Sequence, residues 1–200
     1  MTKKVAILNT GVANIASVKA GIERGEADTY FVNQPEEVED ADYLVFPGVG
    51  AFGAGMAGLL EKGVAESLKT RFRAQRPTVA ICLGLQLLFQ GSEESPGVEG
   101  LGLVPAEITR FSRDLRVPQF GWNQVEAPSE SIYITSGYAY FANSFAAKTE
   151  PEGWVCSLSE YGEPFVAAME KGNWLACQFH PEISGPWGQE ILNRWLNGGR

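Results

Sequence analysis

The stretch "TVAICLGLQLLFQ", residues 78–90, places a cysteine where a buried strand turns into a helix. Residues 77–82 form a short apolar run that predicts a strand, and helical spacing begins at Gly84. In open α/β sheets, functional sites gather at the carboxyl ends of the strands. A nucleophile on a tight strand-to-helix turn is held out of the sheet, and the small residues Ala80 and Gly84 permit such a turn. Cys82 is therefore a candidate nucleophile, and a cysteine packed in the core is the alternative.

The chain as a whole predicts one α/β domain over residues 1–200. Its first half alternates strands with helices, which predicts a doubly wound, mostly parallel sheet. The predicted strands are 3–9, 29–33, 43–47 and 77–82, and the predicted helices are 10–25, 53–61, 63–75 and one from 84. A loop rich in Gly and Pro follows at 92–105, and the second half then predicts antiparallel additions to the sheet. Its predicted strands are 106–111, 122–126, 131–134, 138–145, 153–159, 164–170 and 173–179, with a final helix at 186–197.

The chain has a single histidine, so any Cys–His chemistry within it must use His180. Glu182 follows two residues later, and residues i and i+2 of an extended chain point to the same face. Pro181 disfavours helix at His180 and so favours the extended geometry. A carboxylate on one ring nitrogen would fix the tautomer and steady the imidazolium. A surface histidine in a turn is the alternative for this motif taken alone.

The composition excludes several classes of protein. A net charge of −8 and a pI near 4.8 argue against nucleic acid or an anionic membrane as the main partner. The apolar runs are far shorter than a membrane span, and we expect a cytosolic protein. Three cysteines without CxxC spacing argue against a disulfide framework or a zinc site. Cys177 would point away from His180 along a strand, and we predict that Cys177 and Cys156 are packing residues.

A glycine-rich turn, "FPGVGAFGAG" at 46–55, contains the pattern G-x-G-x-x-G as Gly48, Gly50 and Gly53. This pattern can mark a dinucleotide site, but Pro47 stiffens the turn and the stretch some 20 residues on is basic where an acidic ribose ligand is expected. The other interpretation is a strip of backbone amides that faces the thiol and holds a developing oxyanion.

Taken together, these motifs resemble those of the class I glutamine amidotransferases of the triad type. "PGVG" at 47–50, "CLGLQLL" at 82–88 and "HPE" at 180–182 occur in the order typical of that family. More narrowly, the chain is similar to the glutaminase subunits of imidazole glycerol phosphate synthase. The segments that carry this likeness are "GVANIASV" at 11–18, "PGVGAF" at 47–52, "VPQFGWNQV" at 117–125 and "YFANSFA" at 140–146.

The resemblance implies a flavodoxin-like amidotransferase fold and assigns roles to individual residues. It implies Cys82 as nucleophile, His180 as general base and then acid, and Glu182 as the group that orients the histidine. The oxyanion hole would be formed by amides of Leu83 and of the turn at Val49 and Gly50. The positions that would hold glutamine are Gly50, Gln86, Ser144 and Phe145.

The resemblance also implies a reaction and a partner. Glutamine would be hydrolysed through a cysteine thioester to glutamate and ammonia, with no cofactor and no metal. The partner in a heterodimer would be a (βα)8 cyclase subunit, which receives ammonia through a channel and makes imidazole glycerol phosphate in histidine biosynthesis. The interface would include Gln119, Trp122 and Asn123.

The sequence departs from the family pattern outside the triad. Gln119 and Asn143 stand where histidines are usual, Phe145 stands where tyrosine is usual, and the N-terminal "YGxGN" is "TGVAN" at 10–14. Three other functions remain open at this point. They are a glutaminase serving another synthase such as the pyridoxal phosphate one, a nucleotide- or flavin-binding module, and a catalytically silent interaction subunit.

Overall fold

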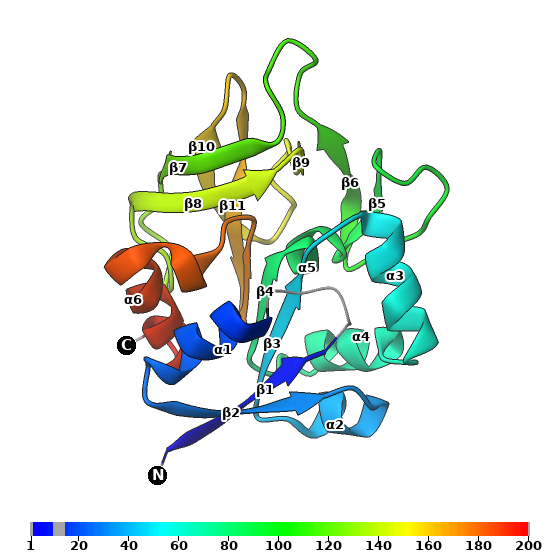
Figure 1. Cartoon of the computed structure of the whole chain (residues 1–200), viewed down its shortest axis with the longest axis vertical. Coiled ribbons are helices and arrows are strands. Elements are labelled where there is room, and N and C mark those ends of the chain that lie inside the picture. The colour runs from blue at the N-terminus through cyan, green and yellow to red at the C-terminus, as the bar shows by residue number, and fades with distance from the viewer. Residues whose placement is uncertain (1, 10–14, 200) are drawn as a thin grey trace.

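The computed structural model describes residues 2–9 and 15–199 and shows an α/β fold built on a seven-stranded sheet (Figure 1). The strand order is β10-β11-β12-β4-β3-β1-β2. The strands are β1 (Lys3–Leu8), β2 (Ala27–Val32), β3 (Tyr43–Gly48), β4 (Thr78–Cys82), β10 (Val155–Glu160), β11 (Pro164–Lys171) and β12 (Trp174–Cys177). Pairing is parallel from β12 to β2, and β11 is antiparallel to both of its neighbours. The predicted mostly parallel sheet with antiparallel additions in the second half is confirmed.

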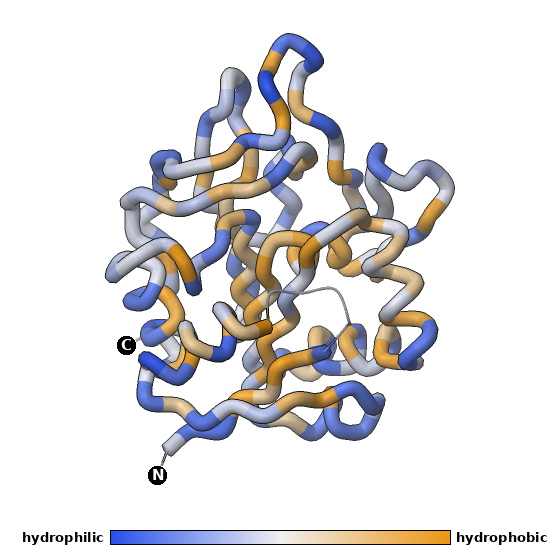
Figure 2. Tube along the Cα trace, viewed as in Figure 1, coloured by the Kyte–Doolittle hydropathy of each residue, from blue (hydrophilic) through white to orange (hydrophobic). Residues whose placement is uncertain are grey.

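Helices cover both faces of this sheet and enclose two cores (Figure 1). One face carries α1 (Ile15–Glu23) and α6 (Gly185–Leu196), and the other carries α2 (Pro35–Asp40), α3 (Phe52–Glu61) and α4 (Ala65–Arg73). Along β1, Val5 and Ile7 pack into the core under α1 and α6, while Ala6 and Leu8 pack into the core under α2, α3 and α4. Figure 2 shows the central strands as the most hydrophobic part of the trace. Strands buried on both faces read as continuous apolar runs, which is why they could be predicted.

Two smaller sheets extend the molecule beyond the carboxyl ends of the central strands (Figure 1). One consists of β5 (Phe89–Ser92), β6 (Val104–Arg110) and β9 (Phe145–Ala146). The other is the antiparallel pair β7 (Gln119–Val125) and β8 (Gly137–Asn143), which we call the β7–β8 ribbon. No helix of the described residues is long and apolar enough to cross a membrane.

The helix predicted from Gly84 is wrong beyond its first turn. It is the four-residue α5 (Leu83–Gln86), and the chain then enters β5. The carbonyl groups of residues 87–90 accept hydrogen bonds from the amides of residues 100–103 instead of continuing a helix. Leu87, Leu88 and Phe89 are all buried, so their apolar run has no exposed face from which helix and strand could be distinguished.

The predicted strand at 131–134 is also wrong. The buried carboxylate of Glu170 accepts hydrogen bonds from the amides of Ile132, Tyr133 and Ile134, at 2.9, 3.2 and 3.1 Å, and from the hydroxyl of Ser131. One carboxylate thus satisfies backbone groups that a neighbouring strand would otherwise satisfy. The short α2 was not predicted, and the part of the predicted helix at 10–14 lies outside the described residues.

Candidate active site

Cys82 ends β4 on a strained turn. Its backbone has φ +54 and ψ −110, a conformation that non-glycine residues rarely adopt. The turn lies against the end of β3, where Gly48 pairs with Cys82. A Cβ atom at Gly84 would lie closer than 3.0 Å to the carbonyl oxygen of Phe46, so only glycine fits at this position. The predicted nucleophile turn is therefore present, and Gly84 is what allows the chain to make it.

His180 and Glu182 are in direct contact. The Nδ1 atom of His180 lies 2.8 Å from Oε1 of Glu182, and His180 lines the same pocket as Cys82. The backbone is extended at His180, as predicted, but Pro181–Ile183 forms a 3₁₀ turn, so the carboxylate reaches the ring from a tight turn and not along a strand. With Nδ1 engaged by the carboxylate, the opposite ring nitrogen is left for the thiol, which is the arrangement of a nucleophile–base–carboxylate triad.

The surroundings of His180 favour its charged form. Burial by itself would lower the pKa of His180, but hydrogen bonds and opposite charges from Cys82 and Glu182 outweigh burial and raise that pKa to about 10. The other thiols have no such neighbour. Burial, with a smaller contribution from Glu150, raises the pKa of Cys156 to about 12, and burial raises the pKa of Cys177 well above its usual range. Both are buried packing residues, as predicted.

A pocket of about 360 Å³ opens above the thiol, and every predicted oxyanion and glutamine position lines it together with Cys82 and His180. These residues are Val49, Gly50, Leu83, Gln86, Ser144 and Phe145. They come from the β3–α3 turn, from α5 and from the break between β8 and β9. Asn143, which stands where the family usually has histidine, lines the same pocket and donates from Nδ2 to the carbonyl oxygen of Phe145 at 3.0 Å. It therefore holds in place a segment predicted to bind substrate.

The glycine-rich turn does not offer a phosphate site. The amide of Phe52, in the first turn of α3, donates to the carboxylate of Glu94 at 2.7 Å, and the amide of Gly53 donates to the hydroxyl of Ser95 at 3.0 Å. A carboxylate thus occupies the helix terminus where a dinucleotide would place its pyrophosphate, which argues against the nucleotide-binding alternative. Gly50 has φ +96, and no atom lies within 4 Å of the place where its Cβ would be.

Two residues of the site were not predicted. Gln178 is 0% exposed, and its Nε2 lies 3.8 Å from the sulfur of Cys82. An amide inside the apolar run "WLACQF", two residues before His180, was the signal that could have identified it. Glu94 brings a carboxylate to the wall of the pocket from a loop without any local pattern.

The predicted partner residues divide between the two faces of the β7–β8 ribbon. Trp122 is 57% exposed, and the unpredicted Phe120 beside it is 69% exposed. Gln119 is only 3% exposed because it points to the inner face of the ribbon, and its place in the partner interface stays a prediction. Asn123 is half-buried and donates from Nδ2 to the carbonyl oxygen of Glu160 at 2.6 Å. Tyr138 on β8 extends the exposed aromatic face.

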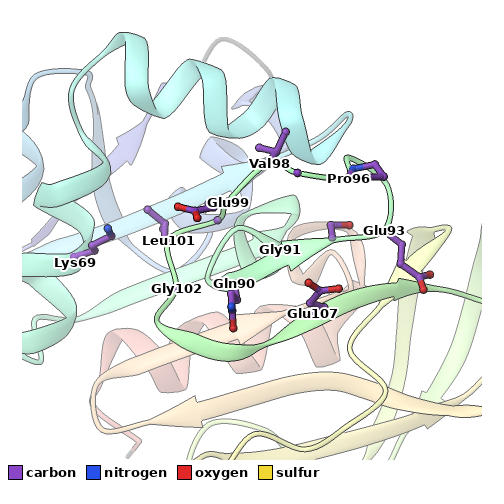
Figure 3. Close-up of a pocket in the computed structure, with 13 residues that line it drawn as sticks. Lys69, Gln90, Gly91, Glu93, Pro96, Val98, Glu99, Leu101, Gly102 and Glu107 are labelled. Carbon is purple, nitrogen blue, oxygen red and sulfur yellow. The ribbon is translucent and has the colours of Figure 1, made fainter.

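A second and larger pocket, about 750 Å³, lies between α4 and the loop that follows β5 (Figure 3). Its charged side chains are those of Lys69, Glu93, Glu99 and Glu107, and much of the rest of its wall is glycine-rich loop. None of the triad residues lines it. Among residues 2–9 and 15–199, no group of three or more His, Cys, Asp or Glu residues is placed to hold a metal ion.

Solved structures that superpose on this chain include glutamine amidotransferases. A structure described as a glutamine amidotransferase superposes with a TM-score of 0.78 and 19% identity, covering 98% of each chain. The PurLQS structure from Thermotoga maritima gives a TM-score of 0.78 at 15% identity, covering 98% of this chain and 99% of the other. At these identities the likeness concerns the fold alone.

Sequence comparison goes further. The family described as "Glutamine amidotransferase class-I" matches residues 12–197. "Imidazole glycerol phosphate synthase subunit HisH" of Thermus thermophilus is 40% identical over 96% of this chain and 95% of its own. "Imidazole glycerol phosphate synthase hisHF, chloroplastic" of Arabidopsis thaliana is 38% identical over 96% of this chain, which spans only 34% of that protein. By fold, by site and by these matches, the chain belongs to the class-I glutamine amidotransferase family and, within it, to the HisH subunits of imidazole glycerol phosphate synthase.

Proposed function

We propose that this chain is a glutaminase that supplies ammonia to the cyclase subunit of imidazole glycerol phosphate synthase, for histidine biosynthesis. The observation that carries the proposal is the hydrogen bond between His180 and Glu182, with His180 and Cys82 together lining the 360 Å³ pocket. The choice of this synthase rests on the Thermus and Arabidopsis relatives, both of which are named after it. The whole chain acts as one amidotransferase domain, in the cytosol, and its three free thiols fit that compartment.

The triad performs the reaction in two steps. The thiolate of Cys82 attacks the side-chain carbonyl carbon of glutamine, and the resulting oxyanion is held by the amide of Leu83 and by one from the turn at Val49 and Gly50. The imidazolium of His180 gives its proton to the departing nitrogen, which leaves as ammonia, and a thioester remains. Neutral His180 then takes a proton from water, the hydroxide attacks the thioester, and glutamate leaves as the thiolate is restored.

The pocket matches both ends of glutamine. Glu94 is a carboxylate on its wall and suits the α-ammonium group of the substrate. Gln86, Ser144 and Phe145 surround the remaining polar atoms. Glycine at position 50 lets the oxyanion turn change conformation at little cost, because it accepts a positive φ and has open space around it. We infer that docking of the cyclase subunit rotates a peptide of this turn into the oxyanion position and so activates the enzyme.

The exposed aromatic face of the β7–β8 ribbon supports a protein partner. Phe120, Trp122 and Tyr138 are large apolar side chains that lie exposed near one another, and such patches mark interaction sites. Trp122 and its neighbours therefore form part of the cyclase interface, with Asn123 at its edge. The Arabidopsis relative is named hisHF, and the segment that matches this chain is 34% of that longer protein.

Glutamate release from glutamine tests the proposal, measured for this chain alone and mixed with a cyclase subunit and its nucleotide ligand. Release only in the mixture, abolished by Cys82→Ser, is the expected result. A free chain that is already fully active would refute the activation by docking. No release under any condition would favour the silent interaction subunit, whose Cys82 would also fail to react with a glutamine-like electrophile. Equal stimulation by a pyridoxal phosphate synthase partner would favour the other synthase.

A further inference from the structure

A line of side-chain amides joins the substrate pocket to the nucleophile. The Nε2 atom of Gln86 lies 3.0 Å from the carbonyl oxygen of Phe145 and 3.0 Å from Oε1 of Gln178. The Nε2 atom of Gln178 in turn lies 3.8 Å from the sulfur of Cys82. Gln178 is completely buried, and Gln86 is buried apart from the side that lines the pocket.

The direction of each hydrogen bond in this line is fixed by the carbonyl group of Phe145, with which the line begins. The backbone carbonyl of Phe145 can only accept, so the atom of Gln86 facing it must be the NH₂ group and not the oxygen. That NH₂ group also faces Gln178, so Gln178 must present its oxygen there. The remaining end of the Gln178 amide is its NH₂ group, and this end faces the sulfur of Cys82. A flip of the Gln86 amide would set its oxygen against the carbonyl oxygen of Phe145, and a flip of the Gln178 amide would set two NH₂ groups against each other in a buried site.

We propose that Gln178 is a catalytic residue of this site, donating an N–H to the Cys82 sulfur, and that Gln86 is a positioning residue that fixes Gln178 in the donating orientation. The proposal rests on the proposed function, since it adds to the same nucleophile. A donor directed at sulfur stabilises the thiolate more than the neutral thiol, because hydrogen bonds to ionised acceptors are the stronger ones. The buried amide supplies this without adding a charge to the pocket.

The same geometry defines what Gln86 offers to glutamine. Both hydrogens of its NH₂ group are directed at carbonyl oxygens of the protein, Phe145 O and Gln178 Oε1. The free polar group that it can turn to the pocket is therefore its own oxygen, an acceptor. Gln86 recognises a donor of the substrate, either the side-chain amide nitrogen or the ammonium group, and it does not bind the substrate's carboxylate or carbonyl.

The charged groups near the Cys82 sulfur are the same in the wild type and in an uncharged Gln178 variant, so the effect of Gln178 can be measured by itself. His180 lines the pocket with Cys82, Glu182 is hydrogen-bonded to the His180 ring, and Glu94 lies on the pocket wall. These three groups stay in place when Gln178 is replaced, whereas a glutamine amide carries no charge at any pH used. A change in the titration of the Cys82 thiol on replacing Gln178 therefore reports the N–H donor.

The test measures the rate of alkylation of Cys82 by iodoacetamide against pH in the full chain, read by peptide mass mapping. Cys156 and Cys177, both buried, serve as internal references in the same digest. Gln178→Met keeps the length of the side chain and removes the donor. It is expected to raise the alkylation pKa of Cys82 by about one unit, which leaves about tenfold less thiolate below that pKa. Gln178→Glu, which adds a negative charge, is expected to raise it further, and Gln86→Met is expected to raise it part of the way.

Glutamine turnover in the complex with the cyclase completes the test. Gln178→Met is expected to lower kcat about tenfold with little change in KM, because the lost contact is to the nucleophile and not to the substrate. An unchanged alkylation pKa in folded Gln178→Met overturns the proposal. Should that variant fail to fold, Gln178→Asn, which shortens the amide by one carbon, is subject to the same criterion. Alkylation needs no glutamine, so a shifted pKa without any glutamate release would refute the proposed function and leave the role of Gln178 standing.

Discussion

Replacing Gly84 by alanine is the sharpest test of how the nucleophile turn is built. The new Cβ would lie well inside 3.0 Å of the carbonyl oxygen of Phe46 and 3.2 Å from its carbonyl carbon, and both atoms belong to the backbone of the buried strand β3. Adding a methyl group to a filled site costs about 1–3 kcal/mol, and the upper end applies here because the backbone of Phe46 cannot move away as a side chain could. Alanine recovers up to about 1 kcal/mol in a helix, so the net loss in the free energy of unfolding is about 2 kcal/mol. For a chain of this size that is a fall in Tm of about 4–8 °C.

The assay pairs calorimetric Tm with the alkylation rate of Cys82, and it uses Gly91→Ala as the control. Gly91 is also buried, but a Cβ there meets nothing closer than 3.5 Å, so the Tm of the Gly91→Ala variant should stay near that of the wild type. Because Cys82 is two residues from Gly84, the alkylation rate should fall in Gly84→Ala and not in Gly91→Ala. Equal Tm values and equal alkylation rates for the two variants would refute the reasoning.

Further predictions concern the groups around the thiol and the exposed ribbon. The one histidine ring should titrate with a pKa of about 10 by NMR, and Glu182→Gln should lower that pKa because it removes one of the two partners of the ring. Because the pKa of His180 is higher in the folded chain than in the unfolded chain, its stabilisation is complete below about pH 6.5 and is lost as the pH rises through about 10. The urea midpoint of His180→Gln should therefore approach that of the wild type over this range, and a constant difference would contradict the raised pKa. Glu94→Gln should raise KM for glutamine about 10-fold or more with a smaller effect on kcat, and the reverse pattern would exclude Glu94 as the ammonium ligand. Trp122→Ala should weaken binding of the cyclase by about 2 kcal/mol, measured by titration calorimetry, with Tm unchanged; full affinity would place the interface elsewhere.

The proposed triad could be predicted from the sequence because histidine and cysteine are rare here and the local geometry of the three residues is restrictive. One histidine, a carboxylate two residues away and a thiol at a strand end leave few alternatives. The central strands were predictable for a related reason, since burial on both faces produces unbroken apolar runs. The same property hid β5, because an apolar run that is buried all round has no periodicity to separate strand from helix.

What could not be predicted depends on contacts between distant residues. Gln178 meets Gln86 across a separation of 92 residues, and no local pattern encodes that meeting. Glu94 reaches α3 from 42 residues away. The turn at 131–134 is held by hydrogen bonds to Glu170, a carboxylate that looks like an ordinary surface residue in the sequence. In each case a buried or partly buried polar group satisfies its hydrogen bonds through a partner that only the folded chain brings near.

His180, the proposed general base, is hydrogen-bonded to the β7–β8 ribbon, which carries the exposed aromatic side chains on its outer face. The amide of His180 donates to the carbonyl of Tyr140 at 3.0 Å, while the hydroxyl of Ser184 donates to the carbonyl of His180 and accepts from the amide of Tyr140, at 2.7 and 2.9 Å. Tyr140 lies edge-on to Trp122, with ring centroids 6.2 Å apart. A protein bound against Trp122 is thus separated from the main chain of His180 by one aromatic ring. Substitutions at this surface would therefore change the ionisation of the His180 imidazole without contacting it. An activity assay of such variants would measure catalysis and partner binding together.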